Sequence, residues 1–325
     1  MSHDRMRRCD LGSHHRSKRG PRVPGARGES MPYTDSADVR LYYEVFGAED
    51  APVLVLVSGG GAQLLSWDER FIAMLTDGGL RVVRFDNRDT GYSALFGSAD
   101  EVDGGYTLSD MAEDVLRILD DLGVDSAHVA GHSMGGMMAQ MLAIEHPERI
   151  RSLGLLSTIP GQSPRYVLHG ERPELGEAPV RLTRAQSMDL AEAAVRADTR
   201  GRYDPQVEWH RAKAGEAYDR GNYPEGYARQ WAALLRAPER LEALTSVTVP
   251  TLVFHGRDDG VLHWASAVDI AEAIPGAELQ VHPDMGHLIP HELWPDLATA
   301  LLRTAARADE ASQRSASASN DSTPD

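Results

Sequence analysis

The feature that most constrains this chain is the stretch 127–136, which reads AHVAGHSMGG. An apolar run leads into Gly-His-Ser-Met-Gly, and a helical pattern follows over residues 137–146. A Gly-x-Ser-x-Gly sequence between a strand and a helix predicts a nucleophile elbow, a turn so tight that side chains in place of its glycines would collide with the neighbouring backbone. The five-residue pattern also arises by chance, but the flanking strand and helix favour the functional interpretation. We therefore expect Ser133 to be held in a strained backbone conformation with its hydroxyl clear of the sheet.

Buried strands alternate with amphipathic helices on both sides of this stretch. Continuous apolar runs or strand patterns occur at residues 39–46, 53–57, 81–85, 149–156, 251–255 and 278–281. Helical patterns lie between them at residues 67–75, 108–122 and 264–273, and a last one ends at residue 307. This alternation predicts an α/β fold with a doubly wound, mostly parallel sheet.

The alternation stops between residues 160 and 238. Pro and Gly breaks there separate helical segments at 184–197, 207–220 and 225–236. We interpret 160–238 as a helical cap inserted into a core made of 31–159 and 239–308. The cap's many aromatic residues either line a substrate pocket or pack the cap onto the core, and their helical spacing favours packing for most of them.

Both ends of the chain differ in composition from the rest. Residues 1–30 are rich in Arg, His, Gly and Pro and lack the apolar run of a secretory signal, which predicts a disordered basic tail. That tail either contacts an acidic partner or is non-essential sequence before a second start at Met31, and we favour the latter. Residues 309–325 are of low complexity, and we expect a disordered C-terminal tail there.

Charge and cysteine content limit the partners of this chain. A formal net charge of −16 argues against nucleic acid and against an anionic membrane surface. No apolar run approaches the length of a transmembrane span. The single cysteine, Cys9, excludes an intrachain disulfide and is compatible with a cytoplasmic location. A homo-oligomer remains possible.

A serine nucleophile needs a base, because its hydroxyl must lose a proton as it attacks. His287 follows the last strand in a Gly-His turn, at the edge of the sheet where the strands' carboxyl ends gather. A surface or helix-capping histidine is the structural alternative. His132 is expected on the opposite side of the elbow and His255 within a strand, whereas no turn places the other candidates, His263, His282 and His291. His287 is therefore the predicted base.

The base needs an orienting carboxylate, and the loop after strand 251–255 offers Asp258 and Asp259. Only one of the two can face the histidine, since adjacent side chains in an extended segment point to opposite sides. The spacing Gly256-x-x-Asp259 leaves room for a turn before the acid and favours Asp259. The resulting order, Ser133, Asp259, His287, is the order expected of this architecture.

The loop Ser58-Gly59-Gly60-Gly61 directly follows the buried strand 53–57. Such a loop can cradle a phosphate, but the G-K-[ST] sequence and the rest of a dinucleotide fingerprint are missing. The alternative is a loop that presents a free backbone amide opposite the elbow, with Gly60 as the expected donor. Together with the amide of Met134 at the helix N-terminus, it would form an oxyanion hole. Farther along, Asp86 and Arg88 are expected to pair with each other and to hold their loop.

The stretch 58–93 resembles aclacinomycin methylesterase and related bacterial carboxylesterases, a group with the α/β-hydrolase fold in which a Gly-Gly pair replaces the usual His-Gly of the oxyanion loop. The resemblance implies Gly60 and Met134 as oxyanion amides. It also implies Asp259 and His287 as acid and base, through Gly256-x-x-Asp259 and Met285-Gly286-His287. Pro224-x-Gly226-x-x-Arg229-Gln230 recurs in relatives as cap structure. Asp89 is a departure, because many members of the superfamily carry Gly there.

These observations predict a serine hydrolase that cleaves a small carboxylic ester, such as a methyl ester or lactone, through an acyl-enzyme, with no metal or organic cofactor. Related dehalogenases and epoxide hydrolases use Asp as nucleophile, and Ser133 argues against both. Two alternatives stay open. The first is a perhydrolase or carbon–carbon bond hydrolase with the same triad, and the second is a non-catalytic small-molecule receptor of the same fold.

Overall fold

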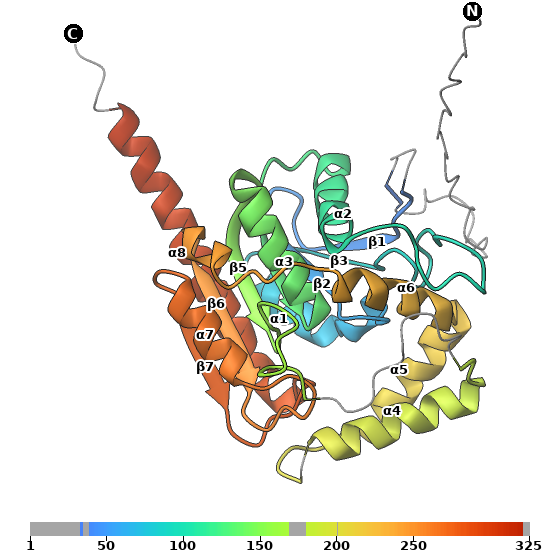
Figure 1. The fold of residues 1–325 in the computed structure, drawn as a ribbon. Helices are drawn as coiled ribbons and strands as arrows, with labels where there is room; N and C mark the ends of the chain where they lie inside the picture. The colour runs from blue at the N-terminus through green and yellow to red at the C-terminus, as the bar shows by residue number, and fades with distance from the viewer. Residues whose placement is uncertain (1–32, 35–38, 169–179, 200, 321–325) are drawn as a thin grey trace, which may run out of the picture.

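The central sheet is built from the apolar strand segments of the sequence. The computed structural model describes residues 33–34, 39–168, 180–199 and 201–320, with the backbone alone over 312–320. The expected N-terminal tail, 1–30, lies outside the described residues. Within them, seven strands form one sheet in the order β1-β3-β2-β4-β5-β6-β7 (Figure 1). They span Tyr43–Phe46 (β1), Val53–Val57 (β2), Arg81–Phe85 (β3), Ala127–His132 (β4), Ile150–Leu156 (β5), Thr251–Gly256 (β6) and Glu278–His282 (β7).

The direction of the strands confirms the predicted fold class. β1 pairs antiparallel with β3, whereas every other pair of neighbouring strands is parallel. Helices cover both faces of the sheet (Figure 1). These are Glu69–Asp77 (α1), Leu108–Asp121 (α2), Met134–Glu145 (α3), Ala265–Ala273 (α7) and Trp294–Asn320 (α8).

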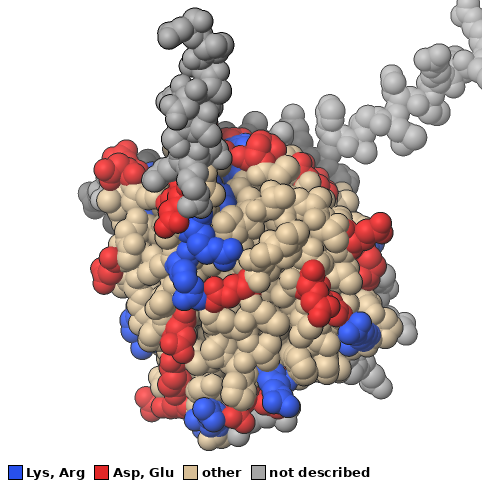
Figure 2. Space-filling model, turned by 90° about the vertical axis from the view of Figure 1, so that its left-hand side faces the viewer, with Lys and Arg blue, Asp and Glu red and all other residues tan. Residues whose placement is uncertain are grey.

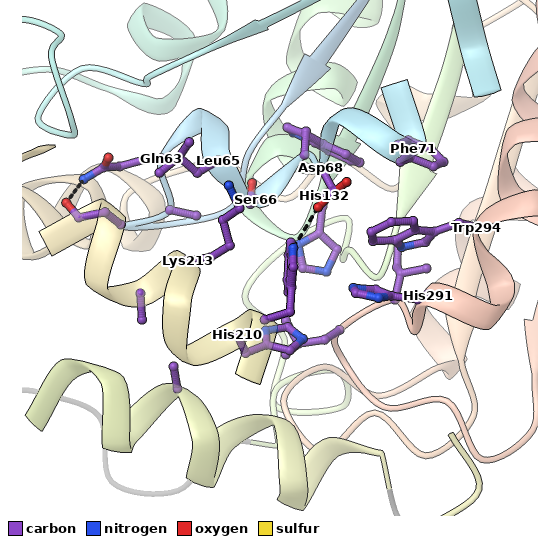
Figure 3. Close-up of a pocket in the computed structure, with 18 of the residues that line it drawn as sticks. Gln63, Leu65, Ser66, Asp68, Phe71, His132, His210, Lys213, His291 and Trp294 are labelled. Atoms are coloured by element: carbon purple, nitrogen blue, oxygen red, sulfur yellow. Dashed lines mark hydrogen bonds between the residues drawn. The ribbon is translucent and has the colours of Figure 1, made fainter. Parts of the chain in front are cut away.

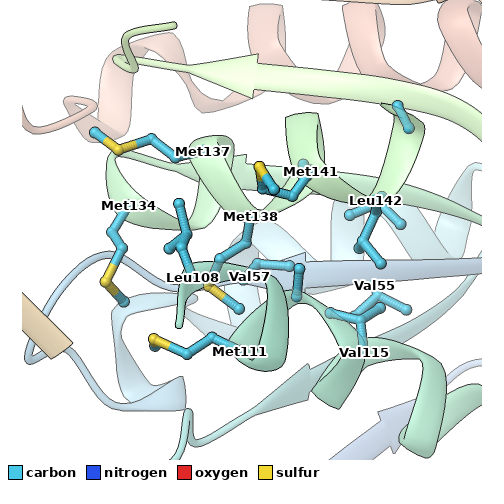
Figure 4. Packing of buried hydrophobic residues seen from close by; sticks show 14 of the residues in the cluster. Val55, Val57, Leu108, Met111, Val115, Met134, Met137, Met138, Met141 and Leu142 are labelled. Atoms are coloured by element: carbon cyan, nitrogen blue, oxygen red, sulfur yellow. The ribbon is translucent and has the colours of Figure 1, made fainter. Parts of the chain in front are cut away.

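Strand β2 shows how one segment serves two cores. All five of its residues are buried, and alternate side chains point to opposite faces of the sheet. Val53, Val55 and Val57 pack into the core under α2, α3 and α7. Leu54 and Leu56 pack into the core under α1 and α8. Figure 4 shows the first core, where methionines of α3 meet the apolar side of α2.

The C-terminal helix corrects one expectation. α8 continues to Asn320, so the prediction of disorder from residue 309 onward is wrong as far as that residue, and 321–325 lie outside the described residues. Between Pro295 and Asn320 the sequence is rich in Ala and has no Gly or Pro, so it does not stop a helix, although its complexity is low. Asp309 also ties the helix to the sheet, because Arg151 of β5 donates to its carboxylate at 2.5 Å.

Between β5 and β6 the described residues form helices α4 (Arg184–Asp198), α5 (Val207–Arg220) and α6 (Pro224–Leu235), which we call the cap helices. Their bounds agree with the helical segments read from the sequence. α4 packs along α5, and in Figure 1 the two lie apart from the sheet, below α6.

Buried charges anchor α5 and α6 to the loop after β3. Arg220 of α5 donates to Asp86 at 2.5 Å, and Arg229 of α6 donates to Asp89 at 2.7 Å. The expected pairing of Asp86 with Arg88 is wrong, because Arg88 pairs with Asp114 of α2 at 2.7 Å. Asp86 and Arg88 thus pair with side chains on two different helices, α5 and α2.

The surface carries both signs of charge. On the face turned to the viewer in Figure 2, acidic and basic side chains are interspersed around a broad uncharged area. In the described part of the chain, no helix is long and apolar enough to cross a membrane.

Candidate active site

Ser133 occupies the turn between β4 and α3. Its backbone has φ 55° and ψ −120°, a conformation that side chains other than glycine rarely adopt. The Ser133 amide donates to the carbonyl of Leu156 in the neighbouring strand at 2.9 Å, which helps to hold the turn. This is the strained geometry that the Gly-x-Ser-x-Gly sequence predicts.

The two glycines of the motif lie where backbone segments come into close contact. A Cβ atom on Gly131 would collide with the carbonyl oxygen of Gly135. One on Gly135 would collide with the carbonyl oxygen of Val57 at the end of β2. The strand-to-helix turn therefore packs against β2 with no room for a side chain at either position.

The loops after β6 and β7 bring Asp259 and His287 together. The distance from Nδ1 of His287 to Oδ2 of Asp259 is 2.8 Å. The other oxygen of Asp259 accepts the amides of Val261 and Leu262, each at 2.8 Å. Asp258 points elsewhere and accepts the amide of Asp284 at 3.0 Å. Of the two adjacent carboxylates, only Asp259 contacts the histidine.

The environment keeps Asp259 ionised. Burial alone would raise its pKa, but the charge of His287 and the hydrogen bonds of His255 and His287 outweigh burial and hold the pKa below its usual range. A carboxylate only accepts hydrogen bonds, so the Nδ1 atom of His287 carries the proton. In the neutral imidazole, Nε2 then keeps its lone pair and is free to accept a proton.

His132 connects the elbow to the histidine loop, a contact that no sequence pattern predicts. Nε2 of His132 lies 2.8 Å from the carbonyl oxygen of His287, and the two ring centroids are 4.9 Å apart. The expected position on the opposite side of the elbow is therefore wrong. Burial, with the charge of His287 as a smaller cause, lowers the pKa of His132 to about 4, so the ring is neutral near pH 7 and donates through Nε2. Among the described residues, the Ser133 hydroxyl makes no hydrogen bond.

The glycine loop lies beside the nucleophile. A Cβ atom built on Gly59 would be 3.3 Å from Cβ of Ser133, and one on Gly60 would be 3.7 Å from Sδ of Met134. Within the described part of the chain, the amides of Gly60 and Met134 donate to no other residue. Two free amides beside the serine are what an oxyanion hole requires.

Gln230, which no sequence pattern marks as a site residue, holds the glycine loop in place. It is fully buried in α6, and its Oε1 accepts the amide of Gly61 at 2.8 Å. Its Nε2 donates to the carbonyl of Arg88 at 2.7 Å. The glycine loop, the loop after β3 and a cap helix are thus joined through one side chain. In the sequence, the Arg229-Gln230 pair indicates cap structure and does not by itself predict a contact with the glycine loop.

Asp198, at the end of α4, is a second residue that sequence reasoning missed. One of its oxygens accepts the amide of His287 at 2.6 Å, and the other accepts the amide of Leu288 at 2.7 Å. A Cβ atom on Gly286 would collide with the Asp198 carboxylate, which explains this glycine. Burial raises the pKa of Asp198 although both amides favour its charge. A cap helix therefore holds the backbone of the histidine directly.

His255, in β6, also touches the acid. Its Nε2 lies 3.2 Å from Oδ2 of Asp259 and 3.1 Å from the carbonyl oxygen of Leu262. It lies within a strand, as expected, and it contacts the same carboxylate oxygen as His287. No three His, Cys, Asp or Glu side chains in the described ranges are grouped so that they could hold a metal ion.

A cavity of about 300 Å³ adjoins the site between α5 on one side and α1 and α8 on the other (Figure 3). Its lining includes Gly61, His132 and Leu288, the chain neighbours of Gly60, Ser133 and His287. The remaining wall is mainly aromatic and aliphatic.

The sheet, the strained serine in its turn and the carboxylate–histidine pair define the class of this protein. A model of the alpha/beta hydrolase fold family matches residues 52–292. The chain belongs to the alpha/beta hydrolase fold family.

Within that family, the chain is similar to rhodomycin D methylesterase DauP of Streptomyces sp. (strain C5). The two are 30% identical, over 81% of this chain and 94% of the relative. The protein RutD of Variovorax paradoxus, whose name proposes a carbamate hydrolase, is 28% identical over 76% of this chain and 89% of its own length. Among solved structures, the enol-lactonase of Burkholderia xenovorans LB400 aligns with a TM-score of 0.67 and 26% identity, covering 85% of this chain and 100% of that one. The resemblance to the methylesterase group is thereby confirmed.

Proposed function

We propose that this hydrolase cleaves carboxylic esters through an acyl-enzyme, with Ser133 as nucleophile, His287 as base and Asp259 as the orienting acid. The observation that carries the proposal is the 2.8 Å contact between Nδ1 of His287 and the ionised Asp259. This contact leaves Nε2 of the neutral imidazole unprotonated. The loop that carries His287 is also joined to the turn of Ser133 through His132.

The proposed reaction has two stages, acylation of the serine and hydrolysis of the acyl-enzyme. Ser133 Oγ attacks the acyl carbon while its proton moves to Nε2 of His287. The carbonyl oxygen becomes an oxyanion, which the amides of Gly60 and Met134 stabilise. As the tetrahedral intermediate collapses, the carbon–oxygen bond to the alcohol breaks and the alcohol leaves with the proton from Nε2. Water then attacks the acyl-enzyme in the same way, which releases the carboxylic acid and restores the serine.

Esters are the substrate class that the relatives favour. DauP is named as a methylesterase and a structural neighbour as an enol-lactonase, and both names describe cleavage of an ester bond. A methyl ester or a lactone is therefore our first choice of substrate. The name of RutD, a carbamate hydrolase, describes attack on a related acyl carbon.

Labelling and turnover test this proposal together. A fluorophosphonate should label the wild-type chain at Ser133 and should leave Ser133→Ala unlabelled. A screen of small methyl, aryl and lactone substrates should give turnover that falls by about 10⁴-fold or more in Ser133→Ala and in His287→Ala, because triad members act as a unit. Labelling at another residue, or a His287→Ala variant with wild-type turnover, would contradict the assignment. An unlabelled wild-type chain would favour the non-catalytic receptor.

A further inference from the structure

The cavity between α5, α1 and α8 has a consistent chemistry that points to a class of substrate. We infer that it binds the ring-bearing part of an uncharged ester, an aromatic or alicyclic group of up to two fused rings. This inference rests on the proposed ester hydrolysis at Ser133 and names the substrate that the site selects.

One end of the cavity is aromatic. Trp209 of α5 lies edge-on to Trp294 of α8, with ring centroids 6.3 Å apart, and edge-on to His291 at 4.8 Å. Phe71 of α1 lies 6.0 Å from Trp294 and stacks on Trp67 at 5.9 Å. Figure 3 shows the rings of Phe71, Trp294 and His291 around one end of the cavity. Rings presented in this way offer large flat apolar surfaces, which suit a flat apolar ligand.

The imidazoles in the wall are neutral near pH 7. Burial lowers the pKa of His132 and of His210 to about 4, and it also lowers the pKa of His291. These side chains offer hydrogen bonds to a hydroxyl or carbonyl group on a ligand without adding charge to the cavity.

The charged side chains in the wall are already paired. Asp68 accepts Nε of Arg70 at 2.9 Å and Nε1 of Trp209 at 2.8 Å, and these bonds hold its pKa below the usual value although burial opposes them. Nζ of Lys213 lies 2.9 Å from Glu216. Among the residues that line the cavity, all of them described, no cation is left to receive a ligand carboxylate. An ester with a free carboxylate would therefore meet Asp68 without compensation, and an uncharged one would not.

The cavity lies where a group attached to the reacting carbonyl would extend. Three residues of its wall are chain neighbours of the proposed catalytic residues: Gly61 follows Gly60, His132 precedes Ser133, and Leu288 follows His287. A ring bound here contacts the protein close to the ester bond, and its binding energy serves to position that bond.

The volume sets the size of the ring system. The cavity measures about 300 Å³. An engineered apolar cavity of about 150 Å³ is known to hold one benzene molecule, so twice that volume has room for two fused rings. An acyl or alkyl chain of a few carbons would leave most of the cavity empty.

Two small-to-large variants on the same helix test the inference. Ala214 of α5 lines the cavity, whereas Ala212 of the same helix is exposed and does not. Ala214→Trp should fill the space, and Ala212→Trp is its matched control. The substrates are ethyl acetate, ethyl 2-naphthylacetate with the ring in the acyl part, and 2-naphthylmethyl acetate with the ring in the alcohol.

In the wild-type chain, at least one naphthyl ester should have a kcat/KM about tenfold or more above that of ethyl acetate. Ala214→Trp should remove this preference, while Ala212→Trp should keep it and leave kcat/KM for ethyl acetate within about twofold of the wild-type value. A carboxylate on the distal ring should lower kcat/KM by about tenfold relative to the neutral ester. Which of the two esters responds identifies the half of the substrate that the cavity holds.

A binding measurement separates this inference from the proposed function. The neutral dye N-phenyl-1-naphthylamine should bind the Ser133→Ala chain with a fluorescence increase that Ala214→Trp abolishes and Ala212→Trp retains. Should Ala214→Trp fail to fold, Ala191→Trp enters the same cavity from α4. Dye binding that neither cavity variant changes, or naphthyl esters turned over no better than ethyl acetate, would overturn the inference. Dye binding as expected in a chain that hydrolyses no ester would leave the cavity assigned and the proposed reaction refuted.

Discussion

At the scale of single residues, two adjacent carboxylates of the site differ in the hydrogen bonds that each accepts. Asp259 accepts Nδ1 of His287 at 2.8 Å together with two backbone amides. Asp258 accepts only the amide of Asp284 among the described residues, at 3.0 Å. Their side chains leave the loop in different directions, so two neighbours of identical chemistry have different consequences for the histidine.

The asymmetry gives the first prediction. Asp259→Asn should lower kcat by about 10⁴-fold, because an amide at this position favours the wrong imidazole tautomer. Asp258→Asn should cost about tenfold or less, through loop geometry alone. The measurement is kcat of both variants on one ester at pH 8, with circular dichroism to confirm folding. If kcat falls strongly in Asp258→Asn and stays near the wild-type value in Asp259→Asn, the orienting acid is Asp258 and the assignment is wrong.

At the scale of elements, the cap helices are tied at both ends to the loops that carry the proposed catalytic residues. Asp198 at the end of α4 holds the backbone of His287 and Leu288. Gln230 of α6 holds Gly61, and Arg229 of the same helix pairs with Asp89. The cap thus fixes the geometry of the proposed base and of the oxyanion loop, in addition to any contact with substrate.

The α4 contact gives the second prediction. Asp198→Asn keeps the shape of the side chain but replaces one acceptor oxygen by an NH₂ group, which cannot accept a backbone amide. His287 should lose part of its positioning, and kcat should fall by about tenfold or more while KM changes by less than about twofold. The fluorophosphonate labelling rate should fall in parallel with kcat.

The matched control for that variant is Asp189→Asn. Asp189 is exposed on the same helix and pairs with Arg211 at 2.7 Å, far from the histidine loop in the chain. It should leave kcat unchanged. Equal losses in both variants would mean that α4 acts through general stability and that Asp198 has no positioning role.

The buried pair of α6 gives the third prediction. Arg229 and Asp89 are 1% and 0% exposed, so Arg229→Met would leave a buried carboxylate without its counter-charge. The free energy of unfolding, measured in urea, should fall by about 3–5 kcal/mol. Asp89 also has φ 66°, a conformation that favours glycine.

Adding Asp89→Gly to Arg229→Met removes the lone charge and relaxes the backbone, so the double variant should recover much of the loss. Asp89 is thus an acid in a backbone conformation suited to glycine because it anchors a cap arginine. A double variant less stable than Arg229→Met alone would contradict this explanation.

At the scale of the whole molecule, buried histidines make stability depend on pH. Burial, assisted by the charge of Arg151, lowers the pKa of His128 in β4 from 6.5 to about 4. Between these values the unfolded chain binds a proton at this residue that the folded chain does not. Stability contributed by the neutral ring is therefore present above pH 6.5 and is lost as the pH falls toward 4.

The fourth prediction follows from that sign. The free energy of unfolding should fall between pH 6.5 and 4. His128 contributes up to about 1.4 kcal/mol per pH unit to the slope. In His128→Asn, whose amide can still bond to Ser152, the slope should be smaller by about that amount. Urea unfolding at several pH values checks it, and an unchanged slope would show that His128 titrates alike in both states.

Much of the fold could be predicted from the sequence because the signals are local. Apolar runs and helical periodicity place the strands and the cap helices within a few residues of their observed ends. The two glycines around Ser133 predict the strained turn, because only a close backbone approach requires them. The Gly256-x-x-Asp259 spacing selects the carboxylate that lies against His287, although the catalytic roles of both residues stay predictions.

What only the tertiary structure decided are contacts between segments distant in the chain. Asp198 lies 89 residues from His287, and Gln230 lies 169 residues from Gly61, so no periodicity or motif links them. The position of His132 against His287 and the extent of α8 likewise depend on which surfaces pack together. A local pattern determines which element forms, because it acts through neighbouring backbone and side-chain geometry. The side chains that meet across the site are decided by how the cap helices pack on the sheet.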